Sequence, residues 1–290
     1  MIESIIVTTV LRGALYALLA SGLSLIYGVG RIINLAHTAF YMLAAFTMYY
    51  FMMQLKLPPV LTVVITVVVA TVVGVLVYRF LIDRIRQHEA AVLIVTVAVA
   101  MALQELMRIG FGSLPSGIND LISGTRVIAG VVVYKQQLLT VGVAALVIVA
   151  LELLLSKTRL GIAVRAVAQD AEVANLMGIS VPRTLTITVG IGTGLAGVAA
   201  VLMAPREGAI YYMWMAPLMM VLVIIVLGGL GNIKGSIIGA FIIALVEALV
   251  YALLPTRSYL YTVFALAVMV VVLSVRPGGL FGIVFEEEKL

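Results

Sequence analysis

Long apolar runs separated by short polar segments dominate the sequence. A helix that crosses the hydrocarbon core of a bilayer needs about 20 predominantly apolar residues. Runs close to this length lie at residues 5–29, 35–53, 59–78, 90–111, 137–155, 185–204, 217–230, 236–254 and 259–275. The run at 217–230 is short and ends in glycines, which is typical of a half-helix. The pattern predicts an all-α, polytopic membrane protein, a single domain of residues 1–290 with about 8–9 transmembrane helices, some of them broken.

Residues 156–184 form the longest polar interruption, and they have helical order of their own. Four small or apolar residues recur at spacings of 3, 4 and 3, so they share one helical face: Val164, Val167, Ala171 and Ala174. The polar residues Arg165, Gln169 and Glu172 recur on another face.

Local signals divide this segment into two helices. Asp170 is a suitable N-cap, Gly178 suits the left-handed residue that ends a helix, and Pro182 stops any continuation. A simple connector needs only about 4–6 residues. We therefore expect two short amphipathic helices at the membrane surface that dock against a partner, rather than a plain solvated connector.

Composition narrows the class further. The chain is 64% hydrophobic and only 11% charged, too few charges to cover the surface of a soluble protein of this length. It contains no cysteine, which excludes disulfides and thiolate metal sites, and its two histidines have no ligand spacing. The net charge of +5 comes from basic residues at helix ends, so it does not indicate a nucleic-acid partner. No cleavable signal peptide is evident.

The distribution of lysine and arginine predicts the orientation, because cytoplasmic loops carry the excess of these residues. With the 156–184 loop in the cytoplasm, the basic residues inside are Arg31, Arg79, Arg84, Arg86, Lys157, Arg159, Arg165, Arg183, Lys234, Arg276 and Lys289. Those outside are Lys56, Arg108, Arg126, Lys135, Arg206 and Arg257, while Arg12 lies in the first run. We therefore expect an external N-terminus, an external loop at 112–136 and a cytoplasmic C-terminus.

Two apolar segments are interrupted by glycine and then by polar residues. The first has Gly28 and Gly30, followed by Asn34 and His37 in apolar surroundings. Irregular backbone at membrane depth is tolerated only where it lines a cavity or is buried in protein. Asn34 and His37 therefore either contact a transported substrate or bond neighbouring helices.

The second interrupted segment contains Gly228, Gly229, Gly231 and Asn232. Its sequence GLGNI at 229–233 repeats GVGRI at 28–32 with an offset of 201 residues, a weak internal repeat. Paired interruptions of this kind indicate the substrate path in transporters built from repeats. The glycines are otherwise explained as close-packing or helix-break residues.

Carboxylates and small or aromatic residues add further candidates. Glu247 has no partner in its own run, which makes it a candidate for the substrate path or a proton relay. Glu105 and Arg108 are spaced to form an ion pair. The sequence VIAGVVVY in the outer loop favours a small hairpin, and glycines at 190, 194 and 197 predict a close-packing helix face. Tyr211, Tyr212 and Trp214 are typical of an interfacial aromatic belt.

Several of these stretches together resemble a known family. GLSLIYGVGRIINLAHTAFYMLAAF, GIAVRAVAQDAEVANLMGIS, VLGGLGNIKGSIIGA and the terminal RPGGLFG are similar, in this order, to the permease subunit of branched-chain amino acid ABC importers, and closest to its shorter type. The resemblance covers nearly the whole chain. One departure is Thr38, where the family usually has glycine after the histidine.

The resemblance implies a role for the 156–184 loop and a set of partners. Glu172, Ala174 and Gly178 match the acidic, small and glycine positions of a coupling helix, which would dock on a cytoplasmic ATPase. The implied assembly has a second, homologous permease, two ATP-binding subunits and an external substrate-binding protein. This chain has no GxxxxGK[ST] phosphate loop, so ATP and magnesium would be used by the partner ATPase, with no cofactor in this chain.

Three functions compete at this point. The leading hypothesis is an ABC importer permease for branched-chain or related amino acids in the cell membrane, or for urea and short amides. An ion-coupled secondary transporter would use Glu247 but leaves the 156–184 loop without a role. An intramembrane enzyme is not supported by any nucleophile–base spacing or metal motif.

Overall fold

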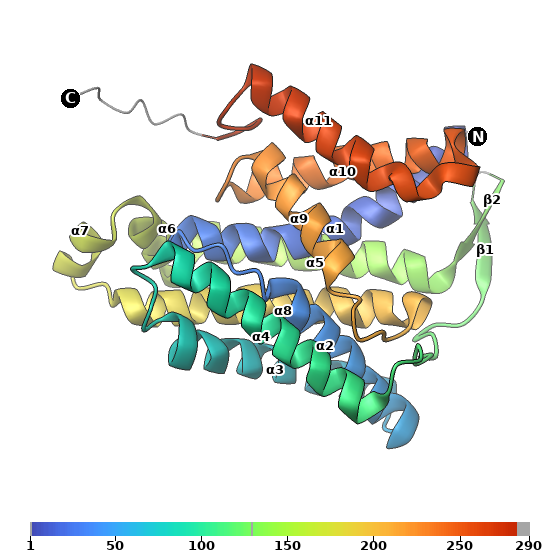
Figure 1. The fold of residues 1–290 in the computed structure, drawn as a ribbon, viewed down its shortest axis with the longest axis horizontal. Coiled ribbons are helices and arrows are strands. Elements are labelled where there is room, and N and C mark those ends of the chain that lie inside the picture. The colour runs from blue at the N-terminus through green and yellow to red at the C-terminus, as the bar shows by residue number, and fades with distance from the viewer. Residues whose placement is uncertain (1, 129, 283–290) are drawn as a thin grey trace.

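The computed structural model describes residues 2–128 and 130–282, and it is almost entirely helical (Figure 1). The α-helices of these residues are α1 (Ile2–Gly30), α2 (His37–Tyr49), α3 (Pro59–Val77), α4 (Glu89–Phe111), α5 (Lys135–Lys157), α6 (Arg159–Gln169), α7 (Ala171–Leu176), α8 (Val181–Glu207), α9 (Met215–Gly228), α10 (Ile233–Leu253) and α11 (Tyr261–Val275). Single π-helical turns at Tyr50–Gln54 and Tyr78–Ile82 extend α2 and α3, and a 3₁₀ segment, Pro255–Leu260, precedes α11. Lys289 lies outside the described residues.

Each apolar run of the sequence contains a helix, and the chain is mostly helical, as expected for a polytopic helical membrane protein. Within the described residues, six helices are long and apolar enough to cross a membrane: Ile2–Gly30, Pro59–Ile82, Glu89–Phe111, Lys135–Lys157, Val181–Glu207 and Ile233–Leu253. The apolar helices α9 and α11 are shorter. With 14 residues, α9 is about 21 Å long, less than the roughly 30 Å of a hydrocarbon core. The expected count of 8–9 crossings stays a prediction.

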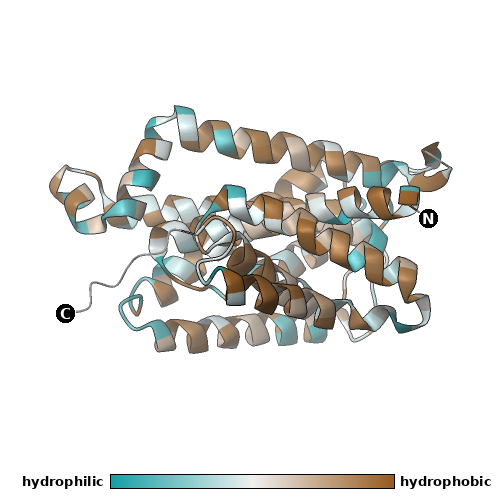
Figure 2. Cartoon of the chain, turned by 90° about the horizontal axis from the view of Figure 1, so that it is seen from above, coloured by the Kyte–Doolittle hydropathy of each residue, from teal (hydrophilic) through white to brown (hydrophobic). Residues whose placement is uncertain are grey.

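Helix α1 runs through the middle of the bundle, with α10 on one side and α5 and α8 on the other (Figure 1). Its residues 17–20 have no exposed surface. Polar residues gather near the ends of the long helices, whereas apolar residues follow their length (Figure 2). This distribution is what a bilayer requires, since lipid is as apolar as the protein core.

The peripheral helix α3 has one buried face and one exposed face, and they differ in their residue types. One stripe of small side chains is buried: Thr62, Thr66, Ala70 and Gly74. The opposite stripe is exposed and consists of valines: Val60, Val64, Val68 and Val72. Small residues let α3 approach α8, and the branched valines face lipid or another subunit.

Glycines set the closest helix contacts, as the spacing predicted for α8. Cβ atoms added at Gly190, Gly194 and Gly197 would contact Val75, Thr71 and Ala70 respectively, all on the segment of α3. A fourth glycine, Gly192, faces α1 instead, where a Cβ would lie 2.9 Å from the carbonyl oxygen of Gly22. Helix α8 is therefore clamped between α1 and α3.

The 112–136 loop contains the expected hairpin, in which β1 (Thr125–Ile128) pairs antiparallel with β2 (Val131–Tyr134). Ser116 and Ala209 exchange two backbone hydrogen bonds of 2.9 Å, which fasten this loop to the segment after α8. Trp214 does not face outward as a free anchor: its side chain is buried, and its indole N–H donates to Gln104 Oε1 at 2.7 Å. The local sequence gave no sign that α4 would cover it. The position of Trp214 at the membrane interface stays a prediction.

We predict that Gly228→Ala destabilises the bundle, because its Cβ would overlap the backbone of Gly235 at the crossing of α9 and α10. Overpacking of this kind costs about 1–3 kcal/mol, which thermal unfolding in detergent would detect. Gly142→Ala in α5 is the matched control, since no atom lies within 4 Å of a Cβ there. Equal melting temperatures for the two variants would contradict the prediction.

Candidate functional site: the 156–184 loop and the ends of helix α1

The 156–184 loop folds into the two expected short helices, α6 and α7, which lie together at one end of the bundle (Figure 1). Thr158 caps α6, since its Oγ1 accepts a hydrogen bond from Gly161 N at 3.1 Å. The guanidinium of Arg165 donates to the carbonyl of Leu155 and so ties α6 to the end of α5. The pair of helices is therefore fixed to the membrane-spanning part.

Asp170 separates the two helices in the predicted way. Its Oδ1 accepts hydrogen bonds from the backbone N–H groups of Glu172 and Val173, both at 2.9 Å. Gly178 has a φ of +84°, which confirms the left-handed turn after α7. Pro182 lies in the first turn of α8, where a proline is tolerated because that N–H has no helical partner.

The continuous apolar face expected along the loop is only partly correct. Val164, Val167 and Ala174 are buried, but Ala171 is exposed. The backbone at Asp170 is extended, with φ of −152° and ψ of 110°, so the helical register does not continue from α6 into α7. The polar residues Arg165 and Glu172 are exposed, as predicted.

Helix α7 and the turn after it present apolar side chains to the outside. Val173, Leu176 and Met177 are 53%, 81% and 79% exposed, and they adjoin the exposed carboxylate of Glu172. Together these four residues form a surface that we call the α7 patch. A contiguous apolar patch with a charged rim is typical of a protein interaction site.

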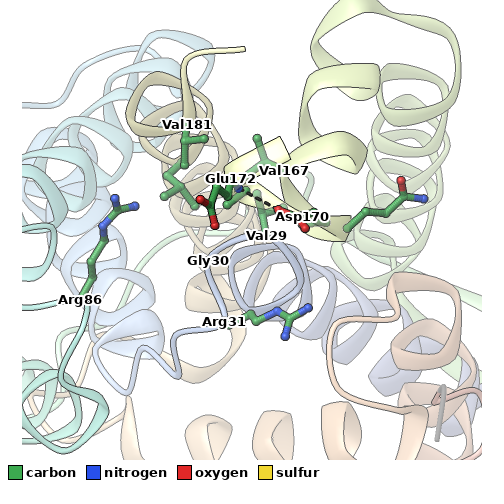
Figure 3. A pocket seen from close by; sticks show the side chains of 12 residues that line it. Val29, Gly30, Arg31, Arg86, Val167, Asp170, Glu172 and Val181 are labelled. Carbon is green, nitrogen blue, oxygen red and sulfur yellow. Dashed lines mark hydrogen bonds between the residues drawn. The ribbon is translucent and has the colours of Figure 1, made fainter. Parts of the chain in front are cut away.

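A cavity of about 420 Å³ opens between this loop and the end of α1 (Figure 3). Arg31 and Arg86 lie around it together with Asp170 and Glu172, so its rim carries both signs of charge. Val29 belongs to its lining and comes from the last turn of α1. The loop is thus in direct reach of the central helix.

The polar residues after α1 are buried and held by backbone groups. Asn34 Oδ1 accepts a hydrogen bond from Ala36 N at 3.0 Å. His37 has no exposed surface, and its Nε2 donates to the carbonyl of Leu19 in α1 at 3.1 Å. Its Nδ1 has no partner among the described residues.

The two glycine-interrupted segments meet in space. A Cβ at Gly28 would lie 2.8 Å from the carbonyl oxygen of Gly231. Gly229 and Gly231 have φ of +101° and +80°, which reverse the chain after α9 ends at Gly228. Asn232 caps α10 by accepting from Gly235 N at 2.9 Å. These residues have packing and turn-forming roles in this structure, and substrate contact by any of them stays a prediction.

Glu247 has partners that lie far away in the sequence. Tyr16 donates its hydroxyl proton to Glu247 Oε2 at 2.8 Å, and Arg12 Nε lies 3.8 Å from Oε1. Arg12 Nη1 also lies 3.3 Å from Glu207 Oε1. We call Arg12, Tyr16, Glu207 and Glu247 the polar cluster. Sequence reasoning did not assemble it, although an arginine and a glutamate that each stand alone in an apolar run are candidates for such a pair.

Other charged residues have simple partners. Glu105 Oε2 lies 2.7 Å from Arg108 Nε, which confirms the expected pair, and Glu152 Oε1 lies 3.0 Å from Lys234 Nζ. No group of three or more metal-ligating side chains occurs in the part of the chain that the structure describes.

Comparison with known proteins places this architecture in a family. Residues 5–273 match the family model described as the permease component of the branched-chain amino acid transport system. The chain is 30% identical to the high-affinity branched-chain amino acid transport system permease protein LivH of Escherichia coli K12, over 93% of this chain and 92% of LivH.

More distant relatives carry similar names. The BraD permease protein of Pseudomonas aeruginosa is 29% identical over 93% of this chain and 92% of BraD. The probable LivH of Methanocaldococcus jannaschii is 26% identical over 95% of this chain and 91% of that protein. No solved structure matches the chain. The match over nearly the whole length, on a polytopic helical bundle, shows that the chain belongs to the branched-chain amino acid transport permease family.

Proposed function

We propose that the chain is the transmembrane permease of an ABC importer that moves branched-chain or related hydrophobic amino acids into the cell. Alternating access of the bundle would carry the substrate, and ATP hydrolysis in separate subunits would drive it. The observation that carries the proposal is the α7 patch, an apolar surface on a short helix that is fixed to the spans yet is covered by none of the residues that the structure describes.

The assembly follows from this role. The α7 patch serves as the docking site for one of two cytoplasmic ATPases, with Arg165, Asp170, Glu172, Ala174 and Gly178 as the coupling element. A homologous second permease completes the membrane part as a heterodimer, and an external binding protein delivers the substrate at the 112–136 loop. The chain lies in the cell (plasma or inner) membrane, with its N-terminus outside and its C-terminus inside.

The substrate path is proposed to follow α1. Gly28, Gly30, Asn34, His37, Gly228, Gly229, Gly231, Asn232 and Glu247 are the candidate residues along it. The contacts of Gly28 and Gly231 suit a hinge between α1 and the turn after α9 better than direct ligation, since each faces the backbone of the other. Gly30 instead faces the side chains of Ile32 and Leu185. An ion-coupled transporter is less favoured, because Glu247 is held by Tyr16 and Arg12 rather than left free to carry a proton.

The orientation is testable because the chain has no cysteine of its own. We expect Leu114→Cys, at 83% exposure in the outer loop, to react with a membrane-impermeant maleimide in intact cells. Met177→Cys, at 79% exposure beside α7, should react only after the membrane is opened. The reverse labelling pattern would show that the orientation is inverted.

Docking on an ATPase is tested by co-purification from the native host. Leu176→Asp should lower recovery of the ATPase at least about tenfold, because a buried charge at an interface anchor costs about 2 kcal/mol or more. Leu176 is 81% exposed in the free chain, so folding should not change. Leu114→Asp is the matched control, with 83% exposure at the other end of the bundle. Recovery equal to that of the wild type in both variants would remove the docking role.

Energy coupling separates the candidate functions. In proteoliposomes that contain the assembled complex and its binding protein, we expect leucine uptake to require ATP on the side of the 156–184 loop and to persist when ionophores remove ion gradients. Valine and isoleucine should compete, whereas urea and acetamide should not. Uptake that collapses with ionophores would instead support the ion-coupled alternative.

A further inference from the structure

A second cavity, of about 190 Å³, lies in the other half of the bundle. The polar cluster forms part of its wall, together with Tyr41 of α2 and with apolar and aromatic side chains that include Leu15, Leu19 and Pro217. Arg12 precedes Gly30 of the first cavity by 18 residues of α1, a distance of about 27 Å at 1.5 Å per residue. The two cavities therefore lie toward opposite ends of the central helix.

The charges around this cavity do not balance. Its lining contains two carboxylates, Glu207 and Glu247, and a single cation, Arg12. Arg12 is shared between them at 3.3 and 3.8 Å, so neither carboxylate has a guanidinium to itself. By formal charge one carboxylate stays uncompensated, and such a site attracts a cationic group.

The charged side chains of the cavity differ in how far they are exposed. The side chain of Glu247 is 3% exposed and forms the floor, whereas those of Arg12 and Glu207 are 32% and 40% exposed and lie at the opening. A small molecule can therefore reach the carboxylates from one end.

Tyr41 adds a further polar group to the wall of the cavity. This residue is 1% exposed and lines the cavity, yet its hydroxyl has no hydrogen-bond partner among the described residues. Its hydroxyl is therefore available to donate a hydrogen bond to a group that enters the cavity. Tyr16, by contrast, already donates to Glu247.

We propose that this cavity binds the zwitterionic head of an α-amino acid. The ammonium group sits between Glu207 and Glu247, and the carboxylate faces Arg12, which keeps free N–H donors, and the hydroxyl of Tyr41. Leu15 and Pro217 give the side chain an apolar wall. The volume equals that of about six liquid water molecules, which suits one small amino acid and not a peptide.

This inference deepens the proposed function and rests on it for the identity of the substrate class. Binding is expected to be weak, because the ammonium group must compete with Arg12 for both carboxylates. Weak binding suits a transport step, in which a substrate must leave as readily as it enters.

The test measures binding by saturation-transfer NMR, which detects weak ligands, on the full-length chain in lipid nanodiscs with any subunits that co-purify. Three probes separate the contributions of the two charged groups of the amino acid. Leucine carries both groups, leucinamide keeps only the ammonium group, and 4-methylpentanoate keeps only the carboxylate. We expect leucine and leucinamide to bind and 4-methylpentanoate to give at least about fivefold less signal, because the cavity carries an excess of negative charge.

Variants assign the signal to the cavity. Glu207→Gln and Tyr41→Phe should each reduce leucine binding at least about fivefold. Neither should unfold the chain, because Glu207 is 40% exposed and Tyr41 gives up no hydrogen bond within the described residues. Glu105→Gln is the matched control, a carboxylate that is also paired with an arginine but lies outside the cavity.

Unchanged leucine binding in both Glu207→Gln and Tyr41→Phe would overturn the proposal, as would binding of 4-methylpentanoate without leucinamide. ATP-dependent uptake on the same preparation distinguishes this failure from failure of the proposed function. If ATP drives uptake but both variants bind leucine as well as the wild type does, the cavity site is excluded and the importer function stands. If the variants abolish leucine binding but the preparation shows no ATP-driven uptake, the importer function is excluded and the cavity site stands.

Discussion

The close crossings of the central helix α1 are the constraint on which the rest of the structure depends. Lipid offers no hydrophobic drive between helices, so packing depends on how closely their backbones approach. A Cβ at Gly22 would lie 2.8 Å from the carbonyl oxygen of Gly192, and Gly28 faces Gly231 in the same manner. These contacts fix α8 and the turn between α9 and α10 against α1, and with them the positions of both cavities.

Helix α1 has a cavity near each end, and its middle is buried in the bundle. Leu18, Leu19 and Leu23 have no exposed surface, and His37 closes on the carbonyl of Leu19 beside Gly22. A conformational change that separates α1 from α8 would have to open this glycine contact. Rigid helices that contact each other through glycine backbone can rock without repacking large side chains. Alternating access requires this kind of motion.

The 156–184 loop joins this central unit to the outside. Arg165 binds the end of α5, and the residues of α6 and α7 line the same cavity as the last turn of α1. Helix α6 also packs against α1 and α8, so a force applied to the exposed α7 patch would reach α1 through packed helices and not through a flexible connector. The loop is stiff for local reasons, since Thr158 and Asp170 cap its two helices.

The sequence by itself determined the helices, their approximate limits and the two-helix loop, because bilayer thickness sets the length of apolar runs and caps act on neighbouring residues. Motifs along the chain also indicated the family. Only the tertiary structure decided that Trp214 is buried under α4, that Ala171 leaves the apolar face, and that Arg12 meets Glu207 and Glu247. The ion-pair partners are separated by 195 residues or more, and no local pattern specifies which faces of distant helices come together. Helix packing alone brings them to one cavity.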